Sequence, residues 1–281
     1  MDSLVSTHWL ADERNATDVR VVDASWFLPS DGRNAATEFA ALHIPGAIFL
    51  DLANLADKTS GLPMTLPNAE DLGIRMAALG LRRDDRIVLY DNSPHHTSAR
   101  AWFMLVRVYG YTHVAVLDGG LEKWAADGLS LESGESASPP VRPEPGFSDH
   151  SKVHTKGEML QNLETSAAQV IDARGPARFH GQEPEPRPEI APGHIPGAFN
   201  LPYPKLFEAD GSWKQGAELR AEFTQAGINI DQPLIATCGS GVTACVLLFG
   251  LHLLGRDDAA LYDGSWAEWG ADPYTPKRLG R

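Results

Sequence analysis

Short apolar runs alternate along the chain with longer stretches in which apolar residues recur at helical spacing. Six such runs predict strands, at 19–23, 86–90, 113–117, 169–172, 233–237 and 259–262. Because these runs are apolar at nearly every position, they are typical of parallel strands that are covered on both faces. Helical spacing is found at 69–79, 98–109, 218–226 and 242–254. The alternation predicts an α/β fold in which a parallel β-sheet is flanked by helices on both faces.

The chain repeats itself. Three short blocks of similar sequence occur twice and in the same order: 21–25 with 170–174, 43–47 with 194–198, and 117–124 with 262–269. The offsets between the paired blocks are nearly constant, from 145 to 151 residues. Chance similarity would not keep both the order and the offset, so the sequence predicts a duplicated domain, each copy with its own sheet.

A segment rich in proline, serine and glycine separates the two copies. Proline fixes φ, and glycine and serine add little packing surface, so this segment is expected to be an extended strap between domains. The sequence therefore predicts a first domain over 1–130, a linker over 131–150 and a second domain over 151–281.

Composition narrows the class of protein. The 281 residues include 24 Lys and Arg against 37 Asp and Glu, which gives a net charge of −13 and makes a nucleic-acid partner improbable. Two cysteines exclude a disulfide framework and a cysteine-rich zinc module. The start of the chain lacks the pattern of a secretory signal, and no apolar run approaches the ~18 residues that span a bilayer. We expect a soluble, cytoplasmic protein with no membrane partner.

The segment Cys238–Ala244 is the loop with the clearest chemical potential. It follows a predicted strand and precedes a long apolar helix, and Gly239 and Gly241 allow a tight turn whose amides converge on one point. A helix N-terminus behind the loop adds positive potential, which favours a nucleophilic thiolate at Cys238. A lone cysteine is more often a small buried apolar residue, but this strand–loop–helix context favours a nucleophile.

Three features together resemble the tandem rhodanese-domain sulfurtransferases. They are the loop Cys-Gly-Ser-Gly-Val-Thr-Ala, the two His-Ile-Pro-Gly-Ala blocks and the two Asp-Gly-Gly/Ser blocks that are each followed by a tryptophan. The resemblance covers nearly the whole chain, and the cysteine loop is its specific signal, whereas the His-Ile-Pro-Gly-Ala blocks are predicted to be structural turns. It implies two rhodanese-like domains, of which the second is catalytic and the first is a non-catalytic copy.

The resemblance also implies a reaction. The Cys238 thiolate is expected to take the sulfur of 3-mercaptopyruvate as a persulfide and to release pyruvate. Loop residues are predicted to cradle the anionic sulfur through their amides: Gly239, Gly241, Val242 and Thr243. Ser240 is predicted to donate a hydrogen bond or relay a proton. The outer sulfur then passes to cyanide, a small thiol or a thioredoxin-like dithiol, and no cofactor is implied.

Two arginines are candidates for binding the donor. By resemblance, Arg178 and Arg187 match the arginines that hold the substrate carboxylate in this family, and a guanidinium pairs well with a carboxylate. The alternative is that they pair with neighbouring glutamates at 183, 185 and 189 on the surface. Asp172 and Arg174 are expected to form a buried structural pair.

The first copy departs from this pattern. Its alignment with the second copy places Asp91 at the position of Cys238, and the residues that follow, 93–98, contain no glycine. An amide cradle for an anion is therefore not expected there. The adjacent His95 and His96 have no third ligand nearby in the sequence, so we expect no metal site.

Other positions depart from the family. Relatives often have a histidine where this chain has Met64, and the acidic partner of that histidine corresponds to Ala53, so a Ser-His-acid relay to Ser240 is not expected. Cys245 lies inside the apolar helix, two turns or ~10.5 Å beyond Cys238, which is too far for a disulfide and indicates a buried thiol.

Rival functions remain open at this point. A phosphatase of related fold needs an arginine six residues after the cysteine, where this chain has Ala244. Thiosulfate:cyanide sulfurtransferase is the nearest alternative. Thiosulfate-type relatives usually carry basic residues after the cysteine, and here Gly239 and Ser240 are neutral. A non-enzymatic sulfide-binding or sensing module is the third reading, although it has no evident use for an intact cysteine loop.

Overall fold

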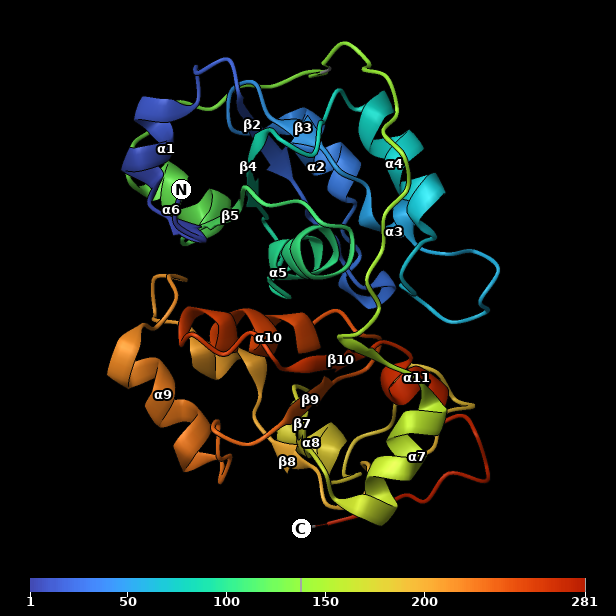
Figure 1. The fold of residues 1–281 in the computed structure, drawn as a ribbon. Helices are drawn as coiled ribbons and strands as arrows, with labels where there is room; N and C mark the ends of the chain where they lie inside the picture. Colours follow the sequence, from blue (N-terminus) through green and yellow to red (C-terminus); the bar gives the residue numbers. More distant parts are fainter. Residues whose placement is uncertain (137, 281) are drawn as a thin grey trace. The chain divides into compact units, whose positions relative to one another are not determined.

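The computed structural model describes residues 1–136 and 138–280 (Figure 1). Contacts divide the chain into two compact units, each made of more than one segment. Unit 1 contains Met1–Asp57, Leu66–Asp149 and Phe207–Trp213. Unit 2 contains Lys58–Thr65, His150–Leu206 and Lys214–Arg281.

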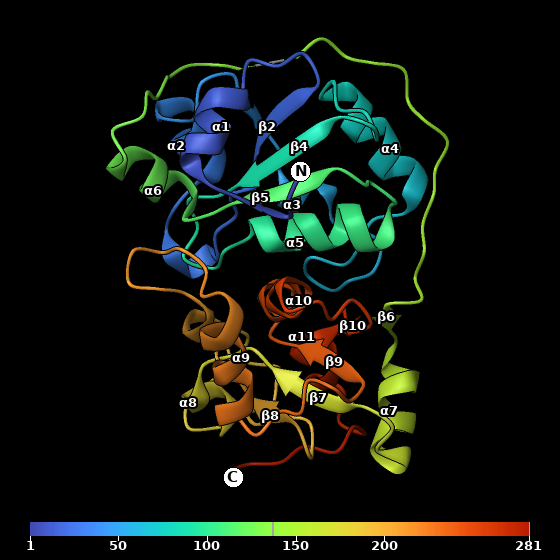
Figure 2. The ribbon, with the colours of Figure 1, turned by 60° about the vertical axis from the view of Figure 1, so that its left-hand side comes forward.

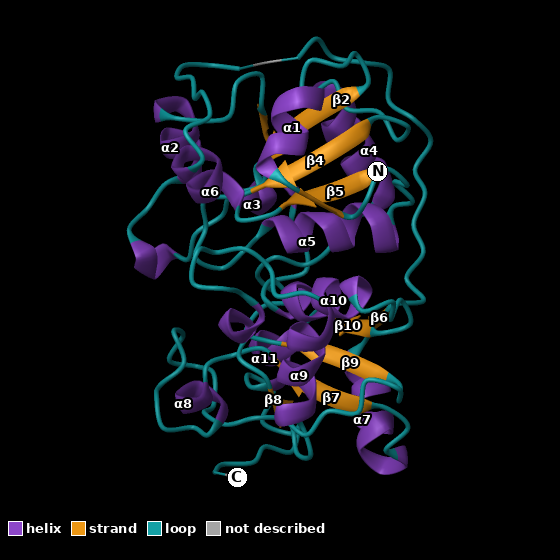
Figure 3. Ribbon diagram, turned by 90° about the vertical axis from the view of Figure 1, so that its left-hand side faces the viewer, coloured by secondary structure: helices purple, strands orange, loops and turns teal. Residues whose placement is uncertain are grey.

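Each unit contains a five-stranded parallel sheet with the same strand order (Figure 3). In unit 1 the order is β1 (Leu4–Val5), β5 (Val114–Leu117), β4 (Arg86–Tyr90), β2 (Val19–Asp23) and β3 (Ile48–Phe49). In unit 2 it is β6 (Val153–His154), β10 (Ala260–Tyr262), β9 (Leu234–Thr237), β7 (Gln169–Asp172) and β8 (Phe199–Asn200). The predicted α/β fold with duplicated parallel sheets is confirmed.

Helices fill the connections between the strands. Those of unit 1 are α1 (Thr7–Glu13), α2 (Ala35–Ala41), α3 (Leu52–Leu55), α4 (Ala69–Ala78), α5 (Ser98–Trp102) and α6 (Gly120–Ala126). Those of unit 2 are α7 (Lys156–Thr165), α8 (Pro176–Phe179), α9 (Gly216–Gln225), α10 (Ala244–Leu253) and α11 (Ser265–Trp269). Short 3₁₀ turns lie at Pro29–Asp31 and Tyr203–Leu206. Among the helices of the described residues, none is both long and apolar enough to cross a membrane.

The six predicted strands agree with β2, β4, β5, β7, β9 and β10 to within one residue at each end. One predicted helix differs. The stretch 98–109 is α-helical only as far as Trp102 and continues as a π-helix over Phe103–Val108. There the amide of Tyr109 donates to the carbonyl of Met104, five residues back, at 3.0 Å. Periodicity of three to four cannot reveal such a widened turn, because the apolar face stays nearly the same.

Both faces of each sheet are covered, as continuous apolar strands require. In unit 1 the side chains of Val21, Val88 and Ala115 pack against residues of α1, α2 and α6, whereas α5 contacts β4 and β5 (Figure 2). In unit 2 the corresponding face packs against α7 and α11, and α10 contacts β9 and β10. The helix α10 is apolar on all sides, and all of its residues from Ala244 to Leu251 are buried.

The two His-Ile-Pro-Gly-Ala blocks form equivalent turns. The Nδ1 atoms of His43 and His194 lie 2.7 and 2.8 Å from the carbonyl oxygens of Phe39 and Phe179, and each ring stacks on that phenylalanine. Both histidines are buried, and burial lowers the pKa of His194. These contacts are those of structural turns.

The residues after 130 that lead to unit 2 are held along unit 1 rather than left loose. Glu132 forms an isolated antiparallel bridge with His43, the Val141 amide donates to Ala77, and the Asp149 amide donates to Val108. From residue 138 to residue 150 the segment contains no helix or strand. It is therefore an extended strap fastened at several points.

The strands β2 and β7 each end in a buried carboxylate, Asp23 and Asp172, but the two carboxylates have different partners. Asp172 forms an ion pair with Arg174 at 2.7 Å, whereas the repeat in unit 1 has Ser25 at the arginine position, and the Ser25 amide donates to Asp23 at 2.8 Å. Burial raises the pKa of Asp23 to about 6, outweighing hydrogen bonds from Ser25 and Tyr90. Asp23 is therefore a carboxyl group whose burial opposes its ionised form.

We expect Asp23 to make the stability of unit 1 depend on pH. Since the folded-state pKa is raised, the contribution is fully present below the unfolded value of 3.8 and is lost as the pH rises through about 6. The loss amounts to roughly 3 kcal/mol. Asp23→Asn should therefore gain stability relative to the wild type between pH 4 and 6.5 in urea unfolding. The matched variant Asp172→Asn should instead lose stability at neutral pH, and a pH-independent Asp23→Asn difference would contradict this assignment.

Candidate functional site

Cys238 lies where β9 ends, at the carboxyl edge of the unit 2 sheet. Its side chain is only 2% exposed. The chain turns through Gly241, which has a φ of +77°, and α10 begins at Ala244. The sulfur-bearing residue thus stands between a central strand and the N-terminus of a ten-residue buried helix, where anions are favoured.

The start of this loop is held by the first three residues of α11, Ser265, Trp266 and Ala267. The Cys238 amide donates to Ser265 Oγ at 3.2 Å. The amides of Trp266 and Ala267 donate to the carbonyl oxygens of Cys238 and Gly239, both at 2.9 Å. The backbone on both sides of the cysteine is therefore fixed from behind by α11.

Arg178 approaches the same loop from α8. A Cβ atom built on Gly239 would lie 3.2 Å from Arg178 Nη2, so the guanidinium lies directly against the glycine backbone. A side chain at 239 would require the guanidinium to shift, and the absence of one leaves space for it. The structure thus brings together Cys238, Gly239 and Arg178, which the sequence singled out separately.

A chain of buried charges fixes Arg178. Glu185 lies between two guanidinium groups, with Oε1 at 2.8 Å from Arg174 and Oε2 at 2.5 Å from Arg178. Arg174 also pairs with Asp172, and its guanidinium lies 4.5 Å from the centre of the Trp266 ring. Asp172, Arg174 and Glu185 have side chains that are at most 2% exposed.

The pKa of Arg174 depends on the two carboxylates and on Cys238. Burial acts to lower the pKa of Arg174, but the carboxylates of Asp172 and Glu185 outweigh it and raise that pKa. A negative charge on Cys238 acts in the same direction as the carboxylates, so Arg174 and the sulfur interact. The expected buried pair of Asp172 and Arg174 is present, as one part of a longer chain.

The other predicted site residues differ in what surrounds them. Val242 is buried, Ser240 is half-buried, and Thr243 precedes α10 without a side-chain capping bond. Arg187 is exposed and forms no ion pair within the described part of the chain, so its guanidinium is open to solvent. Arg178 does pair with Glu185, one of the neighbouring glutamates, but that carboxylate is buried rather than on the surface, and Arg178 also lies against the cysteine loop.

The corresponding loop of unit 1 is filled by its own carboxylate. Asp91 Oδ1 accepts from the Ser93 amide at 3.0 Å, and Oδ2 accepts from the Ser98 amide at 2.8 Å. Amides that could face a bound anion are therefore occupied by a side chain of the same loop. His95 pairs with Asp31 at 3.0 Å, and His96 stacks on Phe207. Within residues 1–136 and 138–280, no group of three or more His, Cys, Asp and Glu side chains could hold a metal ion.

Two positions expected to depart from the family fall in different units. The segment Lys58–Thr65, which carries Met64, belongs to unit 2, whereas Ala53 lies on α3 of unit 1. Met64 is 8% exposed and has a φ of +58°. Neither side chain has an ionisable group, so these positions cannot relay a proton.

Cys245 is a buried thiol in the first turn of α10. Its Sγ donates to the Gly241 carbonyl at 3.2 Å, and neither cysteine forms a disulfide. This contact ties the helix to the loop at the glycine with positive φ, in agreement with the expected structural thiol.

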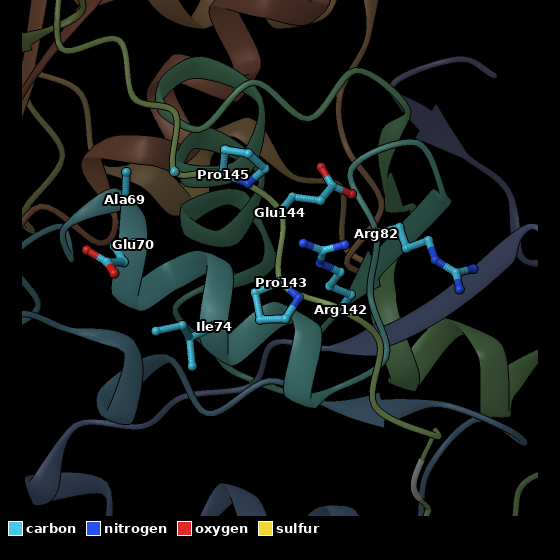
Figure 4. Close-up of a pocket in the computed structure, with 9 residues that line it drawn as sticks. Ala69, Glu70, Ile74, Arg82, Arg142, Pro143, Glu144 and Pro145 are labelled. Carbon is cyan, nitrogen blue, oxygen red and sulfur yellow. The ribbon is translucent and has the colours of Figure 1, made fainter.

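A large pocket of unit 1 contains neither a cysteine nor any other predicted site residue. It has a volume of about 920 Å³ and lies between α4 and the strap, where Ile74, Arg142 and Pro143 line it together with charged residues (Figure 4). None of the predicted site residues lines it. The candidate site is therefore defined by the loop and its charges.

Sequence reasoning missed Ser265 as a neighbour of the cysteine. The signal was present, because the repeated block reads Asp-Gly-Gly in the first copy and Asp-Gly-Ser in the second. Only the hydrogen bond to the Cys238 amide shows why that difference matters.

The chain is similar to known proteins over most of its length. A model of the rhodanese-like domain matches residues 6–127 and 155–272. The 3-mercaptopyruvate sulfurtransferase of Mus musculus is 40% identical over 276 residues, covering 95% of this chain and 91% of that protein. Thiosulfate/3-mercaptopyruvate sulfurtransferase 1, mitochondrial, of Arabidopsis thaliana is 38% identical, covering 98% and 78%. The crystal structure of the 3-mercaptopyruvate sulfotransferase SseA from Escherichia coli superposes with a TM-score of 0.86 at 38% identity, covering 95% and 99%.

Removal of the central carboxylate tests the buried chain. Glu185→Gln leaves Arg178 unpaired and Arg174 with only one carboxylate, so we expect a loss of ~3 kcal/mol in the free energy of unfolding. The matched control is Glu222→Gln, whose pair with Lys214 is partly exposed, and it should cost less than about 1 kcal/mol. Urea-induced unfolding of the full chain measures both. Equal losses in the two variants would show that Glu185 is not central to the stability of unit 2.

Proposed function

The chain belongs to the rhodanese-like domain family, with two copies of the domain, and from this premise we propose that it is a sulfurtransferase acting on 3-mercaptopyruvate. The observation that carries the proposal is the position of Arg178 against Gly239, beside Cys238. In this proposal the sulfur of Cys238 and the guanidinium of Arg178 act on one donor molecule. This arrangement suits a donor that carries both a sulfur atom and a carboxylate.

The proposed chemistry begins with the Cys238 thiolate. It attacks the sulfur of 3-mercaptopyruvate, a sulfur–sulfur bond forms, and the carbon–sulfur bond breaks. The electron pair of that bond remains on carbon as the enolate of pyruvate, which takes one proton to give pyruvate. Cys238 is left as a persulfide whose outer sulfur is available to an acceptor.

The loop and the helix stabilise the negative sulfur in this proposal. The N-terminus of α10 lies directly after the loop, and the amides proposed to face the sulfur are those of Gly239, Gly241, Val242 and Thr243, all within five residues of Cys238. Fixed dipoles of this kind act without reorganisation during the reaction. Ser240, which is half-buried and two residues after the cysteine, is proposed to pass a proton to the enolate.

Arg178 and Arg187 are proposed to bind the carboxylate. Glu185 occupies one amino group of Arg178 and orients it, while Arg187 remains exposed and able to turn toward the donor.

The acceptor is proposed to be thiophilic: cyanide in an assay, and a small thiol or a thioredoxin-like dithiol in a cell. Transfer breaks the persulfide bond and returns Cys238 to the thiolate. A cytoplasmic location stays a prediction from composition, and the Arabidopsis relative carries a mitochondrial name.

Thiosulfate is the competing donor, because the Arabidopsis relative is named for both donors. The neutral residues Gly239 and Ser240 favour 3-mercaptopyruvate, since thiosulfate brings two negative charges to the loop.

Intact mass identifies the sulfur-accepting residue and the donor. Exposure to 3-mercaptopyruvate should add about 32 Da to Cys238, and Cys238→Ser should abolish both the gain and pyruvate release. Cys245→Ser is the matched control and should retain both. A gain only with thiosulfate would select the competing donor, and no gain with either donor would indicate a binding or sensing module instead.

Steady-state kinetics test the arginines. Arg178→Ala and Arg187→Ala should each raise KM for 3-mercaptopyruvate by about 10- to 100-fold, as expected for the loss of a charged hydrogen bond of about 1.5–3 kcal/mol. Arg220→Ala is the control, because Arg220 is an exposed arginine of α9. If kcat/KM were unchanged in both arginine variants, the carboxylate would have to bind elsewhere.

A further inference from the structure

Ser265 occupies an unusual backbone conformation in the most buried part of unit 2. Its φ is +49°, in the left-handed region that side chains other than glycine rarely adopt, and it is fully buried. The repeat in unit 1 has Gly120 at the equivalent position, with a φ of +58°. Both units therefore make the same turn, but only unit 2 makes it with a strained side chain, and such strain persists where surrounding contacts require it.

The hydroxyl of Ser265 has three partners. It donates to the Tyr262 carbonyl at 2.8 Å, and it accepts from the Cys238 amide at 3.2 Å and from Thr237 Oγ1 at 3.3 Å. Because its proton is committed to Tyr262, the oxygen can only accept from the strand and the cysteine. The hydroxyl thus connects the end of β10 with the end of β9 and with the backbone of Cys238.

Unit 1 has no room for a serine side chain at the equivalent position, Gly120. A Cβ atom built on Gly120 would lie 2.6 Å from the Asp91 carbonyl oxygen. The next hydrogen bond is shared, since the amides of Leu121 and Trp266 donate to the carbonyl oxygens of Asp91 and Cys238 at 3.1 and 2.9 Å, so the two units differ in the side chain at this position. Unit 2 therefore combines Ser265 with Cys238. Unit 1 combines Gly120 with Asp91, whose carboxylate fills its own loop.

We propose that Ser265 is the positioning residue of the Cys238 nucleophile, an inference that rests on the proposed function of that cysteine. By accepting the hydrogen bond of the Cys238 amide, the Ser265 hydroxyl fixes the peptide group between Thr237 and Cys238. The amides later in the loop then point toward the sulfur of Cys238. The bonds from Trp266 and Ala267 fix the following two peptide groups. The direction of the loop amides, and with it the acidity of the thiol, then depends on Ser265.

Two variants separate the hydroxyl from the backbone strain. Ser265→Ala removes the hydroxyl and keeps the strained Cβ, whereas Ser265→Gly removes both and restores the residue of unit 1. Both should slow persulfide formation from 3-mercaptopyruvate by about 10- to 100-fold, the range seen when a group that orients a reactive one is lost. The KM for the donor should change little, and Ser265→Gly should be the more stable variant.

The readout that a merely structural role would not move is the pH profile of Cys238 alkylation. The rate of iodoacetamide labelling, followed on the Cys238 peptide by mass spectrometry without donor, reports the thiolate fraction. We expect the midpoint of this profile to lie at higher pH in both variants than in the wild type, because misdirected amides favour the thiolate less. Thr275→Val is the matched control, since its buried hydroxyl bonds, among the described residues, to the carbonyls of Trp269 and Asp272 and to Lys277, none of which belongs to the cysteine loop. It should lose stability and leave the midpoint unchanged.

An unchanged midpoint in Ser265→Ala and Ser265→Gly would overturn the positioning role even if the wild type forms a persulfide. An equal shift in Thr275→Val would overturn it as well, because general destabilisation would then explain the effect. If instead the wild type gained no sulfur from any donor, the proposed function would fail, and the alkylation profiles would still measure the dependence of Cys238 on Ser265.

Discussion

The buried chain of charges that begins at the end of β7 is the interaction on which the site depends. Register places Asp172 beside Thr237, the residue before Cys238, so strand pairing alone brings a carboxylate near the cysteine loop. A buried charge needs a partner, and Arg174 pairs with Asp172. A further N–H group of Arg174 donates to Glu185. Glu185 in turn holds Arg178. The position of an arginine at the loop thus follows from the burial of a carboxylate in the sheet.

The two units show how one scaffold is turned into a site or left without one. Both have a carboxylate at the end of the corresponding strand, β2 or β7, but in unit 1 Asp23 has hydrogen bonds from Ser25 and Tyr90, and among the described residues no arginine pairs with it. At the next strand end, the carboxylate of Asp91 takes the amides that an anion would use. The differences lie at the carboxyl ends of the strands, while the cores beneath them keep the same strand order.

The sequence was sufficient where one physical pattern dominates. Continuous apolar runs predicted β2, β4 and β9, because strands buried on both faces permit few polar residues. Glycines and a strand–helix junction located the cysteine loop. The π-helix at Phe103–Val108 left no mark on the apolar spacing. The chain from Arg174 through Glu185 to Arg178 could not be read either, because several glutamates lie nearby in the sequence and only three-dimensional packing selects one.

The charges of the site explain how a protein of net charge −13 can attract an anionic donor. Asp172, Arg174, Glu185 and Arg178 together sum to zero, so this buried chain orients Arg178 without adding net positive charge. Arg187 stands outside the chain and is exposed, so under the proposed function it supplies the uncompensated charge, together with the dipole of α10. The proposed function thus assigns orientation and attraction to different arginines. This division fits a site in which one guanidinium must be rigid beside the sulfur while the other meets the donor from solvent.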